Sequence, residues 1–197
     1  MSPAALSVAA FVDLSNIWLG LLDEADRNGE WRSDVRLAAA NFRDLLRAGR
    51  PLGRGVVVAN ASIPPAALEH YGVFGEVITR EPGRQSGTEQ ANDETLQVRI
   101  YETIFDRPPG VLVLATGDGA GLSVRRGFIR ALDAARRMRW RIEVVGWGDS
   151  TNSRLRSWLA STGGIFIDLS DHYYSISFIE GGRRVQPITL RHRAPAG

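Results

Sequence analysis

The chain has 197 residues, of which 44% are hydrophobic and 23% are charged, the size and composition of one globular domain with its own core. It contains no cysteine, which excludes disulfide frameworks, zinc–thiolate centres and thiol nucleophiles. All 24 basic residues are arginine, so lysine chemistry is excluded as well, and the formal net charge is only +2.

The sequence also bears on where in the cell the protein is expected. No apolar run approaches the roughly 18 residues of a membrane-spanning helix, so no membrane association is expected. The first residues lack the basic start of a signal peptide and lead directly into a predicted strand. We therefore expect a cytoplasmic protein that forms a single domain over residues 1–197.

Strands and helices alternate along the chain. In chain order, the hydrophobic pattern predicts a strand at 7–13, a helix at 35–48, a strand at 55–61, a short helix to about residue 70 and an edge strand at 74–79. A polar loop at 80–92, a helix at 93–106, a strand at 111–116, a helix at 122–138, a strand at 141–147, a helix at 152–161 and a strand at 165–169 follow. The end of the chain is predicted to form a β-hairpin at 175–190 and a loose tail at 191–197.

This alternation predicts an α/β protein, a three-layer sandwich around a mostly parallel sheet, with its core at about 7–170. The hairpin would be an appendage to that core. Its free edge could pair with another chain, giving a homo-oligomer, or could fold onto its own sheet.

Acidic residues follow the predicted strands. Ligands of open α/β sheets bind outside the carboxyl ends of the strands, so these positions are the candidate site. Asp13 ends the first strand, Asp118 comes two residues after Thr116, and Asp149 follows the strand at 141–147. Asn16 lies three residues beyond Asp13, where it could also cap a helix.

The predicted helix at 93–106 contributes a further acid. Asp93 shares a helical stripe with Gln97, Ile100 and Ile104, so its carboxylate is predicted to face the top edge of the sheet. Glu94 lies beside it. At the start of a helix an acid is also favoured simply by the helix dipole, which is the competing structural explanation.

Taken together, Asp13, Asp93 and Asp118 suggest a metal site. If the strands of Asp13 and Asp118 are neighbours, the three carboxylates converge and repel one another, unless some of them protonate or a divalent cation neutralises them. Since cysteine is absent and the histidines are far apart, the donors are all oxygen, which favours Mg²⁺ or Mn²⁺.

Three motifs resemble those of a known family. FVDLSN (11–16), ANDETL (91–96) and LATGDGAG (114–121) are similar to the three acidic motifs of the NYN branch of the PIN-like nucleases. The resemblance covers roughly residues 7–170. It implies a PIN-like sandwich with strand order 3-2-1-4-5 and a Mg²⁺- or Mn²⁺-dependent ribonuclease that leaves a 5′-phosphate and a 3′-hydroxyl on RNA.

The resemblance also implies roles for particular residues. By that likeness Asp13, Asp93 and Asp118 hold the metal, and Asn16 orients Asp13 or binds a phosphate or a water. Glu94 and Asp149 are candidate further ligands. The predicted contacts to RNA come from Asn16, Thr116, Arg125 and Arg126. For each arginine taken singly, a solvated helix face is the somewhat better explanation.

The sequence departs from the family pattern at two positions. Relatives often carry a second Asp where this chain has Ala120, and a further acid on the central helix near the position of Arg99. The departures put a second metal ion in doubt. They also support an alternative, an NYN-like module that binds RNA or a protein partner without cleaving it.

Two other nucleotide- and phosphate-handling folds match less well. The GDGAG run after a strand suggests a dinucleotide site, but Leu122 stands where the third glycine belongs and Asp118 would repel a pyrophosphate. A haloacid-dehalogenase-type phosphatase would need a second acid at the position of Ser15 and a later lysine, and the chain has neither.

Overall fold

The structure is a computed structural model. It describes residues 6–61, 63, 65–80, 88–116, 127–148 and 150–188, with only the backbone described at 88–91 and 127. Within these residues no helix combines the length and hydrophobicity that crossing a bilayer requires.

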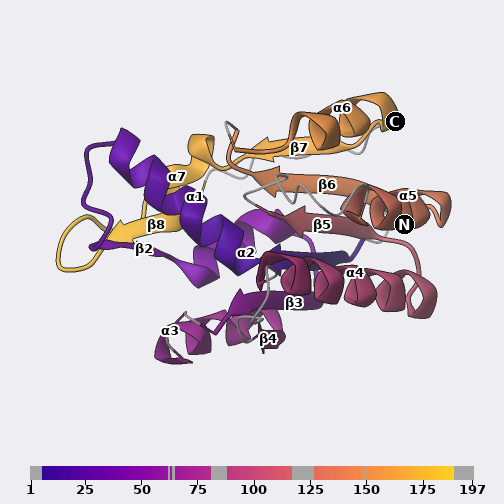
Figure 1. Ribbon diagram of the computed structural model, residues 1–197, viewed down its shortest axis with the longest axis horizontal. Coiled ribbons are helices and arrows are strands. Elements are labelled where there is room, and N and C mark those ends of the chain that lie inside the picture. The colour runs from indigo at the N-terminus through magenta and orange to yellow at the C-terminus, as the bar shows by residue number, and fades with distance from the viewer. Residues whose placement is uncertain are drawn as a thin grey trace.

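Six parallel strands form the central sheet, in the order β4-β3-β1-β5-β6-β7 (Figure 1). Their bounds are β1 (Val8–Asp13), β3 (Leu52–Asn60), β4 (Glu76–Arg80), β5 (Val111–Ala115), β6 (Arg141–Gly146) and β7 (Ile165–Asp168). Two further strands, β2 (Val35–Leu37) and β8 (Ser177–Ile179), pair antiparallel with each other outside this sheet.

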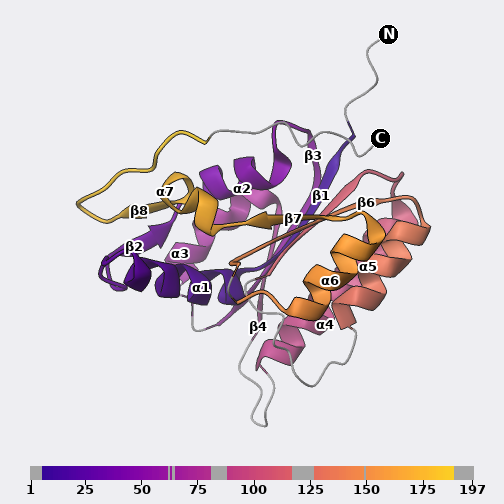
Figure 2. The same cartoon turned by 90° about the horizontal axis from the view of Figure 1, so that it is seen from above.

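Helices cover both faces of the sheet, which gives three layers (Figure 2). One face carries α1 (Leu14–Arg27), α2 (Ala39–Arg47), α3 (Pro65–Glu69), the 3₁₀ turns η1 (His70–Phe74) and η2 (Ser170–His172), and α7 (Tyr173–Ile176). The other face carries α4 (Thr88–Asp106), α5 (Gly127–Arg137) and α6 (Ser153–Thr162). The expected α/β class and layered sandwich therefore agree with the structure.

The central strands are apolar on both sides because both of their faces are covered. Val8, Ala10 and Val12 of β1 belong to the core beneath α1 and α2. Ala9 and Phe11 belong to the separate core beneath α4 and α5, and all five residues are at most 3% exposed. This two-sided burial is the reason that the strand sequences show continuous apolar runs rather than alternation.

The strand order differs from the expected 3-2-1-4-5. The sheet has six strands, because β7 extends it beyond β6, and the short strand β2, second in the chain, lies outside it. The chain moves outward from β1 in one direction through β3 and β4, and in the other direction through β5, β6 and β7. The direction of winding thus reverses between β1 and β5, which are hydrogen-bonded neighbours.

The predicted hairpin at 175–190 is not confirmed. Gly181, with a φ of +73°, does reverse the chain, and the Ile179 N–H donates to the carbonyl of Arg183 at 2.8 Å. The residues from Arg183 to Ile188 form no strand, however, and β8 pairs instead with β2, about 140 residues earlier. The last residues of the hairpin and the tail at 191–197 lie outside the described residues.

Two helix boundaries were also predicted wrongly. The predicted helix at 35–48 begins as strand β2, because Val35 and Leu37 alternate into the core and their backbone pairs with β8. The helix expected at 93–106 begins at Thr88, so Asp93 lies in its second turn rather than at its first residue.

Candidate functional site

The candidate site lies at the carboxyl edge of the sheet, between β1 and β5. A parallel sheet binds its ligands where the winding direction reverses, because the loops of the two strands separate there. Asp13 is the last residue of β1, and Thr116 directly follows β5 with 1% of its surface exposed. Asp118, two residues further along, lies outside the described residues.

Asp13 is a buried carboxylate, 1% exposed, held by local hydrogen bonds. The amide of Asn16 donates from its Nδ2 to Asp13 Oδ2 at 2.8 Å, and the Asn16 backbone N–H donates to Asp13 Oδ1 at 3.3 Å. The second contact makes Asp13 the N-cap of α1, so the prediction that Asn16 could be the cap is wrong. An aspartate is a favoured cap because its oxygen satisfies one of the free N–H groups of the first turn.

The first turns of α4 pack against the same corner of the sheet. Asn92 is 2% exposed, and its Nδ2 donates to Ser15 Oγ at 3.5 Å. Ser15 Oγ also accepts the backbone N–H of Asn60, the last residue of β3, at 2.9 Å. Ser15 therefore joins the start of α1, the end of β3 and the beginning of α4.

The residue of α4 that faces the sheet is Asn92, not Asp93. The buried stripe runs through Asn92, Leu96 and Ile100, whereas Asp93 is half-buried and Glu94 is exposed. The predicted stripe was correct at Ile100 and Ile104, but its first members, Asp93 and Gln97, each lie one residue beyond the buried ones. One residue is about 100° around a helix. Asn92 was therefore missed. The rule that singled out Asp13, a polar residue at a strand end, would also have found Asn60.

The structure places only some of the proposed metal ligands. Among the described residues, no group of three or more acidic or histidine side chains is arranged to hold a metal ion. Asp118 and Asp149 lie outside those residues, as do Arg125 and Arg126. The structure does place the buried Asp13, Thr116 directly after the neighbouring strand, and Asp93 one residue beyond Asn92. These donors are oxygens, which fits a hard divalent cation rather than a softer metal.

A hollow of about 440 Å³ opens between β4 and α4, beside the first turns of that helix. Arg80, the last residue of β4, lines it and donates from Nε to Thr95 Oγ1 at 3.1 Å. Glu94 and Val98 line it from α4. Two arginines line the hollow, Arg80 and Arg99, and Arg80 lies at the carboxyl edge because it is the last residue of β4.

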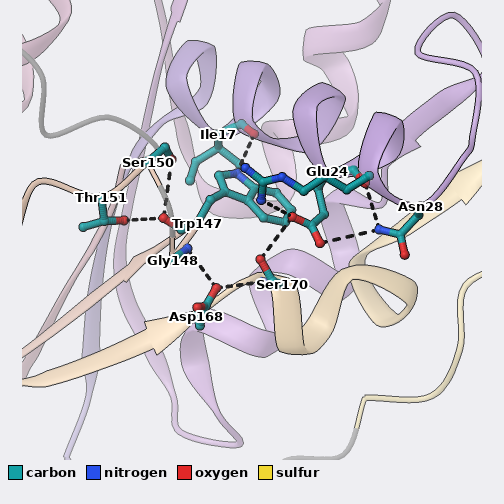
Figure 3. A network of polar contacts seen from close by, with 10 residues as sticks. Ile17, Glu24, Asn28, Trp147, Gly148, Ser150, Thr151, Asp168 and Ser170 are labelled. Atoms are coloured by element: carbon teal, nitrogen blue, oxygen red, sulfur yellow. Dashed lines mark hydrogen bonds and ion pairs between the residues drawn. The ribbon is translucent and has the colours of Figure 1, made fainter.

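The first residues after β6 are held by hydrogen bonds to α1 and to β7 (Figure 3). The Trp147 indole is 1% exposed, and its Nε1 donates to the carbonyl of Ile17 in α1 at 3.0 Å. Asp168, the last residue of β7, accepts the Gly148 backbone N–H at 2.9 Å and that of Ser170 at 3.0 Å. Trp147 and Gly148 are thus tied to α1 and to β7, whereas Asp149 lies outside the described residues. Asp168 is a polar residue at a strand end that the sequence pattern did not single out.

A second acid in the same network is Glu24, 9% exposed on α1 (Figure 3). It accepts from Arg27 Nη1 at 2.9 Å and from Ser170 Oγ at 3.2 Å. These contacts satisfy its charge within the protein. Glu24 is therefore a structural residue that joins α1 to the end of β7.

Comparisons with known proteins leave the chain without a family. No protein-family model matches it, and no curated protein matches it either. A solved structure from Trypanosoma cruzi, described as a "putative aspartate carbamoyltransferase", aligns with 82% of this chain at 16% identity and a TM-score of 0.22. The alignment spans 57% of that protein's length, and its TM-score is too low for the likeness to bear on fold or function.

Proposed function

We propose that this chain is a PIN-like, NYN-type ribonuclease that hydrolyses RNA with a Mg²⁺ or Mn²⁺ ion bound at the carboxyl edge between β1 and β5. The observation that carries the proposal is the buried Asp13 at the reversal point of the sheet, with Asn16 holding its carboxylate at 2.8 Å. The pairing of β1 with β5 is the arrangement that the proposal needs, because Asp118 follows β5 closely in sequence.

The chemistry assigned to the chain follows from the donor types. Ionised Asp13, Asp93 and Asp118 can only accept, as ligands of a cation must. A bound divalent ion supplies an activated water and neutralises the scissile phosphate. Asn16 keeps the Asp13 carboxylate in one orientation, and Thr116, Arg125 and Arg126 are assigned to the RNA backbone.

A module that binds RNA without cleaving it is the second candidate. The observation in its favour is Ala120, which stands where the proposed family often has another aspartate. The two candidates differ in their need for metal, since a binding module should hold RNA equally well in EDTA.

The test is cleavage of a fluorescently labelled single-stranded RNA in Mn²⁺ by the variants Asp13→Asn, Asp93→Asn and Asp118→Asn. We expect each variant to fold and to lose activity by roughly 100-fold or more, because each removes a charged ligand. Asn keeps the capping oxygen at position 13, so the start of α1 should be retained. Circular dichroism checks the fold.

Asp106→Asn is the matched control, because Asp106 is an exposed acid at the far end of α4. Its activity should equal that of the unaltered chain. Full activity in any two of the three site variants would refute the nuclease. RNA binding in EDTA with no cleavage in Mn²⁺ would support the binding module instead.

A further inference from the structure

The side-chain amide of Asn92 is buried, and its oxygen lacks a hydrogen-bond partner among the described residues. Its Nδ2 is directed to Ser15 Oγ, while its Oδ1 is inaccessible to solvent and has no hydrogen-bond partner in the described part of the chain. An unpaired buried acceptor destabilises a folded protein, and buried polar atoms are rarely left in that state. A leucine at this position would continue the apolar stripe of Leu96 and Ile100 without that cost. A ligand bound to Oδ1 would remove this cost.

The position of Asn92 indicates which ligand this is. The side chain is anchored to Ser15, two residues after Asp13, and its own neighbour in the helix is Asp93. It thus lies in the corner formed by the ends of β1 and β3 and the beginning of α4. The carboxylates assigned to this corner attract a cation.

We propose that Asn92 Oδ1 is a neutral oxygen ligand of the divalent cation in this corner, an inference that rests on the proposed function. Amide oxygens are suitable ligands for hard cations such as Mg²⁺ and Mn²⁺. A neutral ligand adds a coordinating atom without adding to the repulsion among the carboxylates. It would also add a ligand oxygen to a chain that has Ala120 in place of a further acid.

The test measures how tightly the intact chain binds Mn²⁺ in the absence of RNA. Calorimetry measures this affinity directly, and the electron paramagnetic resonance spectrum of free Mn²⁺ measures it by the ion left unbound. Asn92→Leu should weaken Mn²⁺ binding by about tenfold or more. In EDTA the same variant should unfold at a higher temperature, because the unpaired oxygen is gone. Asn92→Asp should bind Mn²⁺ more tightly, since it keeps the oxygen and adds a charge.

Gln97→Leu is the matched control. Gln97 lies on the same helix, five residues further from the corner, and its Nε2 is likewise buried without a partner. Its removal should leave Mn²⁺ affinity unchanged. If both Leu variants weaken binding equally, the effect is general to the helix and the proposal fails.

Other results separate this inference from the proposed function. If Asn92→Leu keeps its Mn²⁺ affinity while Asp13→Asn loses it, Asn92 is not a ligand but the metal site stands. If Asp13→Asn also retains Mn²⁺ binding and cleavage, the proposed function itself is wrong. If Asn92→Leu does not fold, the Asn92→Asp variant decides the question. A Mn²⁺ affinity equal to that of the unaltered chain would then overturn the inference.

Discussion

At the scale of single residues, the clearest constraint is the approach of Trp147 to Gly20. A Cβ atom at Gly20 would lie 2.0 Å from Cδ1 of the Trp147 ring, far inside van der Waals contact. The ring cannot easily move, because it is buried and its Nε1 is bonded to the carbonyl of Ile17. Glycine in the interior of α1 is therefore kept for space, although it disfavours a helix by about 1 kcal/mol relative to alanine.

We accordingly expect Gly20→Ala to destabilise the chain by about 1–3 kcal/mol, since overpacking outweighs the gain in helix propensity. Urea unfolding followed by circular dichroism measures the effect. Gly72→Ala is the control, because a Cβ there meets no atom within 4 Å. In a Trp147→Leu background the same Gly20→Ala change should lose most of its penalty. A stabilising Gly20→Ala would show that the contact is not limiting.

At the scale of elements, the β2–β8 ribbon depends on the hydrogen bonds that Glu30 accepts from Arg183 and Tyr173, here called the Glu30 cluster. The ribbon has only three residue pairs, too few to be stable alone. Arg183, after β8, donates to both carboxylate oxygens of Glu30, before β2, at 2.8 and 2.9 Å, and the Tyr173 hydroxyl donates to Glu30 at 2.5 Å. These hydrogen bonds, that of Arg183 above all, lower the pKa of Glu30 from its ordinary 4.5, although partial burial opposes the shift.

The Glu30 cluster should make the free energy of unfolding depend on pH. A carboxyl group with a lowered folded-state pKa stabilises the protein above its unfolded pKa, and this contribution is lost as the pH falls through the folded value. Glu30→Gln should therefore cost about 1–3 kcal/mol near pH 7 and progressively less as the pH falls below about 4. Thermal unfolding of both chains across this pH range checks the prediction.

Glu180→Gln is the control for Glu30→Gln in the Glu30 cluster, because the Glu180 side chain is 69% exposed and its ion pair with Arg36 lies at the surface. Its effect should stay within about 0.5 kcal/mol at every pH. A Glu30→Gln penalty that did not change with pH would mean that packing, rather than charge, holds the ribbon.

At the scale of the whole molecule, a largely buried ion pair connects the two halves of the sheet. Arg50, just before β3, donates to both carboxylate oxygens of Glu143 in β6, at 2.6 and 2.9 Å. Their side chains are 18% and 4% exposed. Because β3 and β6 lie on opposite sides of β1 and β5, this pair spans the point at which the winding reverses.

Breaking one partner of this pair should be far more damaging than replacing both. Glu143→Gln leaves the Arg50 guanidinium buried without its countercharge, which should destabilise the chain by about 3–5 kcal/mol. The double variant Arg50→Met, Glu143→Leu should stay within about 1 kcal/mol of the unaltered chain. Chemical denaturation of the three proteins compares them, and a double variant as unstable as the single one would contradict the expectation.

The sequence by itself determined the α/β class, the positions of the buried strands and the place of Asp13 at the end of the first of them. These features are local or periodic: VAAFVD and VLVLA are continuous apolar runs because both faces of the sheet are covered. The contact between Asp13 and Asn16 spans three residues, so their nearness follows from one helical turn.

Only the tertiary structure decided the features that depend on distant segments. The pairing of β8 with β2, and not with the chain beyond Gly181, results from competition between partners that no local pattern records. Whether Asn92 or Asp93 faces the sheet depends on the rotation of α4 as it packs, and one residue changes that direction by about 100°. Burial of the whole apolar stripe sets this rotation, so the side chain that reaches the site is chosen by packing.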